Sequence, residues 1–339
     1  MRIAIYDDPN LTGCTFYRSH LPFSHLHKAR AIEVVRVSDR WAPVDFLYLN
    51  ILFQARPFTQ KHFEFMSLAK QSGAKIWIDT DDDLTAIPLT NPAEAMIDPH
   101  LENAKKCYQI ADLVTVSTDF LGEEIRKKFP GVPIIVLPNV LSLPDKINTN
   151  FTGRPTVFWR GSSTHGEDLE EWKDEIIEAS HKFIFHWFGR LPFWHNKMSR
   201  TIDFDKRVSE GNKEPVTTPA VIYHKWTSMF SYFHKLSNLN LNVMLYPLAD
   251  NHFNLSKSNI AWQEATFAGA ACITNARGAE WTKPGILHDP QILFKEDKRR
   301  IREAVKRSRA ELSKFTFQNR QERLLQIAAH LAAGKINEL

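Results

Sequence analysis

Cysteine is scarce in this sequence of 339 residues, which contains three, Cys14, Cys107 and Cys272. They lie far apart, without the paired spacings that are typical of a disulfide framework or a structural zinc site. We therefore expect neither kind of site, and a reducing compartment fits the sequence best.

Long apolar runs are also missing. A helix that spans a bilayer needs roughly 20 apolar residues, whereas a run such as residues 46–53 has the length of a strand and is interrupted by Asn50. The N-terminal segment is short, apolar and followed at once by acids, unlike a secretory leader with its basic segment, long apolar run and cleavage site. These absences predict a cytoplasmic protein without integral membrane contact.

Charge of one sign is not in large excess, because 43 Lys and Arg residues stand against 39 Asp and Glu residues, a formal net charge of +4. Such a balance permits anionic partners without requiring them. With 43% hydrophobic and 24% charged residues, the chain has the composition of a globular protein. Its length exceeds the size at which a single core stops growing, so two domains are expected.

The first half of the chain alternates short apolar segments with helical patterns at residues 61–71 and 119–128. The strand-like segments are residues 3–6, 46–49, 75–78, 113–117 and 134–137. This alternation is typical of a doubly wound parallel sheet. Residues 141–154 carry proline, asparagine and glycine with little apolar pattern, which predicts a linker.

The alternation restarts after the linker and predicts a second α/β domain. Its segments are residues 156–159, 168–180, 183–188, 242–246, 259–267, 271–274, 298–313 and 318–333, of which 168–180 is an acidic helix and the last two are the final helices. Residues 196–218 are polar and mixed in charge, which predicts an irregular insertion. The expected organisation is one domain over 1–145, a second over 146–315, and a segment over 316–339 whose helix could pack back on the first.

Loops after strands are the places to look for function, because open parallel sheets bind ligands at the carboxyl ends of their strands. The first such loop contains Gly13 and Arg18. A flexible glycine beside a guanidinium could hold a phosphate or a sugar carboxylate. The alternative is a surface loop in which Arg18 is solvated.

Four aspartates follow the predicted strand 75–78, namely Asp79, Asp81, Asp82 and Asp83. Like charges this close must be separated, solvated or neutralised. Three interpretations are open: a magnesium or manganese site against a nucleotide-sugar diphosphate, acceptors for substrate hydroxyls, or a helix cap with solvated acids. We favour hydroxyl binding and expect no metal site.

A third loop joins the predicted strand 156–159 to the acidic helix and contains Arg160, Gly161, Ser162 and His165. Backbone N–H groups and the positive end of the helix would receive a pyrophosphate there. An ordinary strand-to-helix turn with a Ser or Thr cap is the alternative.

A fourth loop, residues 247–258, leads into the helix that holds Glu264. Lys257 and the start of the helix could meet the phosphates of a nucleotide, while the Glu264 carboxylate could bind the ribose hydroxyls. The alternative is a capped helix with an exposed glutamate.

Residues 254–269, followed by the segment 271–274, resemble the nucleotide-sugar signature of GT-B glycosyltransferases, especially the large retaining family that includes sucrose and glycogen synthase-like enzymes. Other landmarks of that fold are similar to residues 111–118, 138–139, 157–165 and 188–189. The resemblance implies two Rossmann-like, doubly wound parallel-sheet domains that face each other across a cleft. It also implies a hexosyl- or pentosyltransferase that takes a nucleoside-diphosphate sugar as its donor substrate, with no cofactor and no metal.

The resemblance further implies roles for single residues. Glu264 would bind the ribose, Lys257 and Arg160 the diphosphate, and the loop at Gly13 would close on the sugar donor. Where the family commonly has another glutamate, eight positions before Glu264, this sequence has Ser256, and Asn254 or Asp250 could supply the missing sugar contact. The catalytic set is then Arg160, Lys257 and Asp82, and the donor-binding set is Gly13, Arg18, Gly161, Ser162, His165, Asn254, Ser258 and Glu264.

Two other interpretations stay open: a nucleotide-sugar epimerase or phosphorylase on the same fold, and a non-catalytic protein that binds nucleotide or glycan. The acceptor of a transferase could be a glycan, a small metabolite, or a hydroxymethylated base in DNA of the kind that phage glycosyltransferases modify. Two basic stretches hint at a polyanion: residues 295–309, and the segment 196–218 with Lys197, Arg200, Lys206 and Arg207. Such runs are as a rule solvated helix faces.

Overall fold

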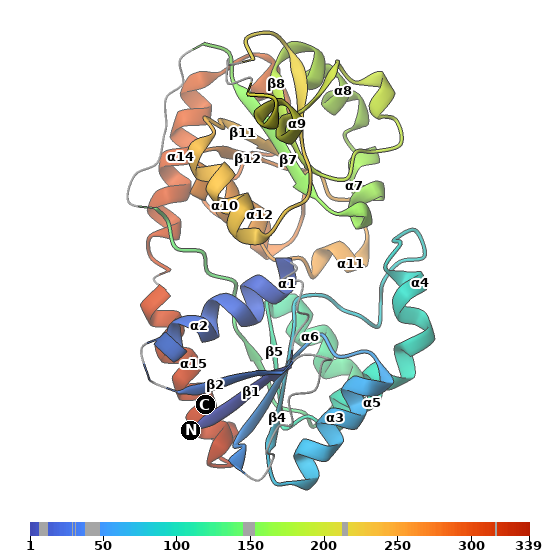
Figure 1. Cartoon of the computed structure of the whole chain (residues 1–339), viewed down its shortest axis with the longest axis vertical. Coiled ribbons are helices and arrows are strands. Elements are labelled where there is room, and N and C mark those ends of the chain that lie inside the picture. The colour runs from blue at the N-terminus through green and yellow to red at the C-terminus, as the bar shows by residue number, and fades with distance from the viewer. Residues whose placement is uncertain are drawn as a thin grey trace.

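The computed structural model describes residues 1–6, 13–28, 30, 32–37, 48–144, 153–211, 216–315 and 317–339. These residues form two parallel sheets of six strands, one in each half of the molecule (Figure 1). The first sheet has the order β2-β1-β3-β4-β5-β6. Its strands are β1 (Arg2–Tyr6), β2 (Glu33–Val37), β3 (Ile51–Ala55), β4 (Lys75–Thr80), β5 (Leu113–Val116) and β6 (Ile134–Val136).

The second sheet has the order β12-β11-β7-β8-β10-β9, and all its pairings are parallel. Its strands are β7 (Thr156–Gly161), β8 (Ile184–Gly189), β9 (Thr201–Asp203), β10 (Ala220–His224), β11 (Val243–Leu245) and β12 (Ala271–Ile273). The strands β8, β9 and β10 lie on one side of β7, and β11 and β12 lie on its other side, so the order in which strands are added reverses between β7 and β11. Such a switch point opens a crevice at the carboxyl ends of the strands. The predicted α/β class with two doubly wound parallel sheets is therefore confirmed.

Helices cover both faces of each sheet. In the first half they are α1 (Gly13–Thr15), the π-helical turn η1 (Phe16–His20), α2 (Leu21–Lys28), α3 (Gln60–Gln71), α4 (Glu94–Ile97), η3 (Asp98–His100), α5 (Leu101–Ile110) and α6 (Asp119–Lys128). Ile3 and Ile5 of β1 face a core shared with α2, whereas Ala4 and Tyr6 face a core shared with α3, α5 and α6. This alternation follows from the two-residue period of a strand.

The helices and helical turns of the second half are η4 (Ser163–His165), α7 (Gly166–Glu170), α8 (Lys173–Lys182), η5 (His195–Lys197), α9 (Phe204–Ser209), α10 (Met229–Asn238), α11 (His252–Leu255), α12 (Ile260–Ala268), η6 (Ala279–Trp281), α13 (Gln291–Phe294) and α14 (Lys298–Leu312). One core of the second sheet includes residues of α8 and α14, and the other includes residues of α10 and α12. Phe16 and Tyr17 of η1 belong to this second core as well, so the apolar interior continues from one domain into the other.

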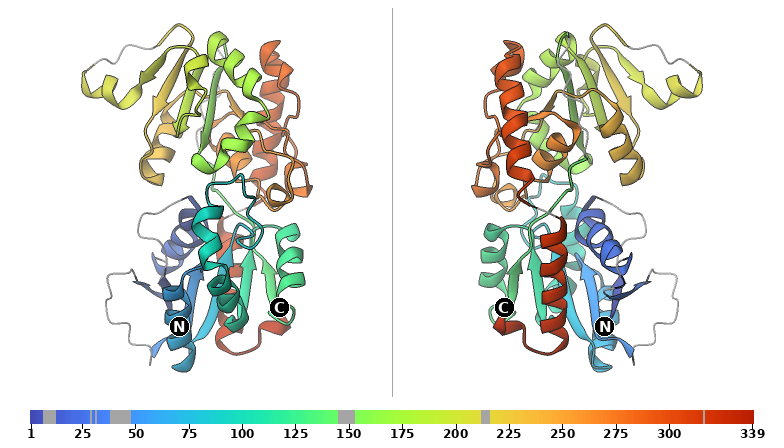
Figure 2. Two further views of the ribbon diagram at one scale, coloured as in Figure 1. Left: turned by 90° about the vertical axis from the view of Figure 1, so that its right-hand side faces the viewer. Right: turned by 90° about the vertical axis from the view of Figure 1, so that its left-hand side faces the viewer.

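The last long helix, α15 (Phe317–Ala332), lies beside the first sheet, whereas its neighbour in sequence, α14, lies beside the second sheet (Figure 2). Leu324, Ile327 and Leu331 of α15 are buried with Ile3 and Trp77 in the core on the α2 face. A short helical turn, η7 (Ile336–Glu338), follows. The chain thus passes between the two halves twice, between β6 and β7 and again between α14 and α15.

Three expected elements differ from the structure. Of the strand expected over 46–49, residues 46–47 lie outside the described residues and 48–49 are not strand. The strand begins later, after Asn50, whose side chain and carbonyl bind the neighbouring segments. The Arg2 amide donates to Asn50 Oδ1 at 2.8 Å, and the Lys75 amide donates to the Asn50 carbonyl at 2.9 Å. Residues 51–53 are then buried on both faces, as expected of a central strand.

The expected helix 168–180 is divided into α7 and α8, because Trp172 adopts a non-helical conformation and packs into the core instead. The expected irregular segment 196–218 contains β9 and α9. Asp203 is the N-cap residue of α9, because its side chain accepts a hydrogen bond from the Lys206 amide at 3.0 Å. In a segment of mixed charge this aspartate could not be told from the other charged residues. Among the described residues, no helix is long and apolar enough to cross a bilayer, and the cytoplasmic location stays a prediction.

Two buried histidines on neighbouring strands predict a pH dependence of stability. His186 Nδ1 lies 2.8 Å from His224 Nε2. Burial lowers the pKa of His186 to about 4, and burial together with the charge of His186 lowers that of His224 to about 2. The unfolded chain protonates both residues near pH 6.5, so the stability that depends on neutral histidines is present above that pH and is lost as the pH falls toward 4.

We expect the free energy of unfolding, measured by urea titration, to fall by roughly 2 kcal/mol per histidine between pH 7.5 and pH 5. The double variant His186→Phe, His224→Phe keeps an aromatic ring against Phe188, whose ring centroid lies 4.2 Å from that of His224. This variant should lose that part of the pH dependence. Equal pH dependence in the parent and the variant would contradict the prediction.

Candidate active site

The carboxyl ends of the two sheets meet at the middle of the molecule, where α11 and α12 approach the first domain (Figure 1). Several hydrogen bonds join the domains there. They include Thr118 Oγ1 to the Ser256 carbonyl at 3.1 Å, Asn139 Nδ2 to Ser258 Oγ at 2.9 Å, the Leu141 amide to Gln263 Oε1 at 2.9 Å, and Gln263 Nε2 to the Asn139 carbonyl at 2.9 Å. The predicted donor-binding residue Ser258 is therefore part of the domain contact.

The loop after β7 begins where the ends of β7 and β8 approach each other closely. A Cβ atom on Gly189, whose φ is +112°, would lie 2.0 Å from the Gly161 carbonyl oxygen. A Cβ atom on Gly161 would lie 2.5 Å from the ring of Trp159. Only glycine fits at the ends of β7 and β8, and Ser162 follows with its hydroxyl accepting from the Thr164 amide at 3.3 Å.

Glu264 is 1% exposed, so the alternative of an exposed glutamate on a capped helix is wrong. Arg160 Nε donates to Glu264 Oε2 at 2.5 Å, and the Tyr232 hydroxyl donates to the same oxygen at 3.0 Å. The Tyr17 hydroxyl, from the first domain, donates to Glu264 Oε1. Three donors from separate elements therefore hold this carboxylate.

The ion pair with Glu264 occupies only part of the Arg160 guanidinium. Its carbon lies 5.4 Å from the centre of the Tyr246 ring, in cation–π contact. Its Nη2 atom is buried and has no hydrogen-bond partner among the described residues. Buried donors in native structures are almost always paired, so this nitrogen is a candidate donor to a ligand.

Lys257 reaches across the cleft to the aspartate loop. Its Nζ lies 2.6 Å from Asp82 Oδ1, and Arg56 Nη2 lies 3.3 Å from Asp82 Oδ2. Burial opposes ionisation of Asp82, but Lys257 and Arg56 outweigh it and lower the pKa of Asp82 to about 2. Burial likewise opposes the charge on Lys257, and Asp82 raises its pKa above the ordinary value.

Arg56 is a site residue that sequence reasoning missed. It follows β3 and has a φ of +49°, which is uncommon for a residue with a side chain. Its amide donates to the Asp79 carbonyl at 2.8 Å, which turns the chain toward the aspartate loop. A single arginine after a short strand carries no signal that separates it from a surface charge.

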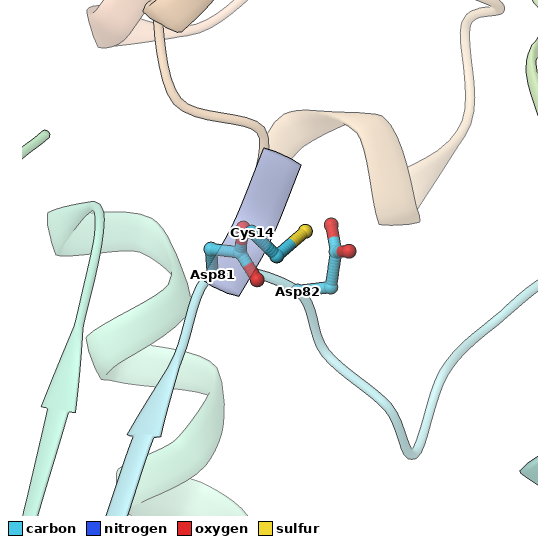
Figure 3. Close-up of side chains that lie close together, drawn as sticks. All are labelled: Cys14, Asp81 and Asp82. Carbon is cyan, nitrogen blue, oxygen red and sulfur yellow. The ribbon is translucent and has the colours of Figure 1, made fainter. Parts of the chain in front are cut away.

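One group in the described part of the chain has the residue types of a metal site. The ligand atoms of Cys14, Asp81 and Asp82 lie within 4.8 Å of one another (Figure 3). Arg56 Nη1 donates to Cys14 Sγ at 3.0 Å, and burial and Asp81 raise the pKa of the Cys14 thiol to about 12. Arg56 lies near both carboxylates, and Lys257 lies near that of Asp82, so protein cations supply positive charge to this group; the absence of a metal there stays a prediction.

Arg18 corrects a prediction. It is 1% exposed, and its Nε and Nη2 atoms each donate to Asp79 at 2.7 Å. Its Nη1 atom donates to the Leu137 carbonyl at 2.6 Å and to Asn139 Oδ1 at 3.1 Å. The guanidinium joins η1 to the ends of β4 and β6. Arg18 is therefore neither the expected residue that holds a phosphate or a sugar carboxylate nor a solvated surface residue.

The four aspartates within residues 79–83 have different partners. Asp79 is taken by Arg18, and Asp83 pairs with Lys128 Nζ at 2.5 Å, which leaves Asp81 and Asp82 toward the cleft. Gly13 begins α1 and has open space where a Cβ would be. The residues before it, 7–12, lie outside the described part of the chain, so the closing loop predicted there stays a prediction.

Asn254 and Ser256 also differ from expectation. Asn254 Nδ2 donates to Asp168 Oδ1 at 2.7 Å and to the Ala249 carbonyl at 2.9 Å, so its amide hydrogens are not free for a sugar. Ser256 is buried and donates to the Phe253 carbonyl at 2.6 Å. Asp250 is exposed and pairs with Arg277 at 2.7 Å. The missing glutamate thus has no direct replacement in this arrangement.

A small cavity lies between the loop at Pro88 and Asn91 and the loops of the second domain that hold His165 and Lys257. Its volume is about 10 Å³, room for about one water molecule. The two domains therefore meet closely at this point.

No protein-family model matches the sequence, and no curated protein matches it. Solved structures do match. A sucrose-phosphate synthase from Thermosynechococcus elongatus aligns with a TM-score of 0.65 and 12% identity over 98% of this chain and 99% of that one. An alpha-glucosyltransferase in complex with UDP and a 13-mer DNA containing an HMU base aligns with a TM-score of 0.62 and 14% identity over 96% and 99%.

The Anabaena protein Alr3699/HepE, in complex with UDP and glucose, aligns with a TM-score of 0.61 and 10% identity over 97% of this chain and 99% of that one. Each alignment includes both domains, because nearly the whole length of each chain is covered. At these identities the likeness concerns the fold alone. The chain has the two-domain GT-B fold of these glycosyltransferases.

Proposed function

We propose that this protein is a glycosyltransferase that moves a sugar from a nucleoside-diphosphate sugar to a hydroxyl group in the cleft between the domains. The observation that carries the proposal is the buried guanidinium of Arg160, with an unpartnered Nη2, at the carboxyl end of β7 beside the glycine loop. The GT-B fold and the neighbours that hold UDP support the same chemistry.

The proposed reaction breaks the bond between the anomeric carbon and the diphosphate, whose negative charge grows as the bond breaks. Arg160, Lys257 and the backbone N–H groups after β7 would stabilise that charge. Glu264 is assigned to the ribose hydroxyls. The sugar donor has to displace two groups of the first domain, because Asp82 occupies Lys257 and Tyr17 occupies Glu264.

Asp82 is proposed to bind the acceptor hydroxyl once Lys257 has turned to the diphosphate. Arg56 stays beside Asp82 and favours its ionised form, and an ionised carboxylate accepts hydrogen bonds from hydroxyl groups. We therefore assign it to orienting the acceptor.

The acceptor is proposed to be a glycan or a hydroxymethylated base in DNA. The DNA proposal has the support of the neighbour solved with modified DNA and of the basic face of α14. That helix exposes Arg299, Arg300, Arg302, Lys306 and Arg307, and Lys295 precedes it. Phosphate contacts of this kind would make DNA affinity fall by orders of magnitude between low and moderate salt.

A donor and acceptor screen tests the proposal. The chain is incubated with UDP-, GDP- and ADP-sugars and a panel of glycans, and with duplex DNA with and without hydroxymethylated pyrimidines, while free nucleoside diphosphate and labelled product are measured. Release that depends on an acceptor supports a transferase. Conversion of the donor sugar without an acceptor favours an epimerase, release that requires phosphate favours a phosphorylase, and no turnover favours a binding protein.

We predict that activity does not depend on a divalent metal, because Arg160 and Lys257 supply the positive charge and the Cys14 group faces Arg56. Initial rates in excess EDTA should equal those in buffer with added manganese or magnesium. Loss of activity in EDTA that manganese restores would contradict this and would identify Asp81 and Asp82 as metal ligands.

A further inference from the structure

An open groove of about 480 Å³ lies at the outer edge of the second domain, beside the edge strand β9 and helix α9. Its lining includes the cations Arg200, Lys206 and Arg207 and the hydroxyl-bearing residues Thr217 and Thr218. Arg200 is exposed, and its guanidinium makes one hydrogen bond among the described residues, from Nη2 to Thr218 Oγ1 at 2.6 Å. A guanidinium has five N–H donors, so most of those of Arg200 are open to a ligand.

The two carboxylates that line this groove are each matched by a lysine. Asp203, the N-cap residue of α9, has its Oδ2 atom 3.2 Å from Lys225 Nζ, and Glu210 has its Oε1 atom 3.9 Å from Lys206 Nζ. Counted with Lys225, the groove has four cations to two carboxylates. This excess of positive charge favours an anionic ligand.

Exposed aromatic rings continue from this groove toward the first domain. Trp226 follows Lys225 in the loop after β10 and is 56% exposed, and Phe230 at the start of α10 is 57% exposed. The ring centre of Phe230 lies 5.5 Å from that of His20, in the first domain. Exposed apolar groups that lie close together are typical of an interaction site.

Positive charge resumes on the first-domain side of His20. Burial and the charges of Arg36 and Lys28 lower the pKa of His20 below its ordinary value, so both cations lie near this ring. Lys28 and Arg36 are exposed at the end of α2 and in β2. Helices α9, α10 and α2 lie on one side of the molecule, whereas α14 lies on the other (Figure 2).

These residues form a band in which cations from both domains flank exposed rings. The basic–aromatic band is defined as Lys28, Arg200, Lys206, Lys225, Trp226 and Phe230. It adjoins the candidate active site, because Tyr232, two positions after Phe230 on α10, donates to Glu264 at 3.0 Å. Cations that meet phosphates, beside aromatic rings on which bases stack, are the common means of binding single-stranded nucleic acid.

We propose that the basic–aromatic band binds a nucleic-acid acceptor. Arg200 and Lys206 on one side and Lys28 on the other contact its phosphates, and an unpaired base stacks on Trp226 at the boundary between the domains. This inference rests on the proposed function and selects nucleic acid among its acceptors. A neutral glycan would use the rings but would gain nothing from the cations, so charge separates the two.

Fluorescence anisotropy of a labelled single-stranded oligonucleotide with one hydroxymethylated pyrimidine, at several salt concentrations, tests the band. On a single strand each phosphate contact contributes about 0.7 to the slope of log affinity against log salt. The double variant Arg200→Ala, Lys28→Ala should therefore bind more weakly and flatten the slope by roughly 1.4. Trp226→Ala should weaken binding by about five- to a hundredfold with a parental slope, because stacking releases no counterions.

Matched controls remove similar side chains far from the cleft. Lys70→Ala, Lys335→Ala takes away two exposed lysines at the opposite end of the first domain, and Tyr48→Ala takes away an aromatic side chain that is 70% exposed before the start of β3. Both controls should bind the oligonucleotide as the parent does. All the substituted residues are exposed, so every variant should unfold at the parental temperature.

Calorimetry with UDP and the transfer assay separate this inference from the proposed function. Salt-sensitive oligonucleotide binding that both band variants weaken, without turnover of any sugar donor, would contradict the transferase and leave the band intact. Four results would overturn the inference: parental oligonucleotide affinity in both band variants, a loss confined to Arg299→Ala, Arg300→Ala on α14, no oligonucleotide binding by a parent that transfers sugar to glycans, or weaker UDP binding by Trp226→Ala, which would assign that ring to the sugar donor.

Discussion

Arg160→Ala is expected to lower kcat by roughly ten- to a thousandfold with a smaller effect on the KM of the sugar donor. The negative charge on the diphosphate is larger in the transition state than in the bound substrate, so a cation that meets it stabilises the transition state more. Arg160 is placed for this, because its Nη2 is buried without a partner while its Nε holds Glu264.

The variant also removes one of the three donors to Glu264, and breaking a buried ion pair destabilises a fold. Thermal unfolding should therefore accompany the kinetics. Arg160→Lys keeps the charge without the planar pair of donors and should lie between the parent and Arg160→Ala. Arg323→Ala, half-buried on α15, is the matched control. A folded Arg160→Ala with parental kcat and a raised KM would contradict a role specific to the transition state.

Lys257→Ala and Glu264→Ala are expected to weaken binding of the nucleoside diphosphate by roughly ten- to a thousandfold, measured by calorimetry. Lys257 is assigned to the phosphates and Glu264 to the ribose. Unchanged affinity in both variants would remove the nucleotide from the second domain.

Asp82→Asn should change the affinity in the opposite direction. In the closed arrangement Asp82 holds Lys257 at 2.6 Å, so the sugar donor competes with this carboxylate for the same ammonium group. Loss of the negative charge should tighten nucleotide binding while lowering turnover, since the acceptor loses its orienting group. Weaker binding in Asp82→Asn would show that the ion pair supports the nucleotide site and does not compete with it.

Some site residues were predictable because their signals are local. Gly161 and the loop around it follow an apolar strand and precede a helix, and any parallel sheet places such a loop at its binding edge. Lys257 and Glu264 lie within a single strand–loop–helix unit, so their spacing is visible in the sequence. The buried position of Glu264 agrees with a role in that unit, although the donors that hold it do not follow from the spacing.

Other site residues depend on contacts between distant segments. Tyr17 and Glu264 are 247 positions apart, and Tyr232 and Glu264 are 32 apart. Arg18 looked like a ligand clamp, but its donors are all directed into the first domain, and whether an arginine meets a ligand or an internal aspartate depends on what the fold places beside it. The same holds for Asp168, an apparent surface acid that proved to be buried.

Local sequence patterns are enough to predict the two parallel sheets, the loops after their strands and the glycines of the loop after β7, because period, strand length and turn chemistry act over a few neighbouring residues. Which charges pair with one another follows only from the packing of the two domains: Asp82 pairs with Lys257 and Arg56, and Arg160 pairs with Glu264. A buried charge must have a partner to offset the loss of hydration. That partner is selected by how two domains close on each other, which no local pattern records.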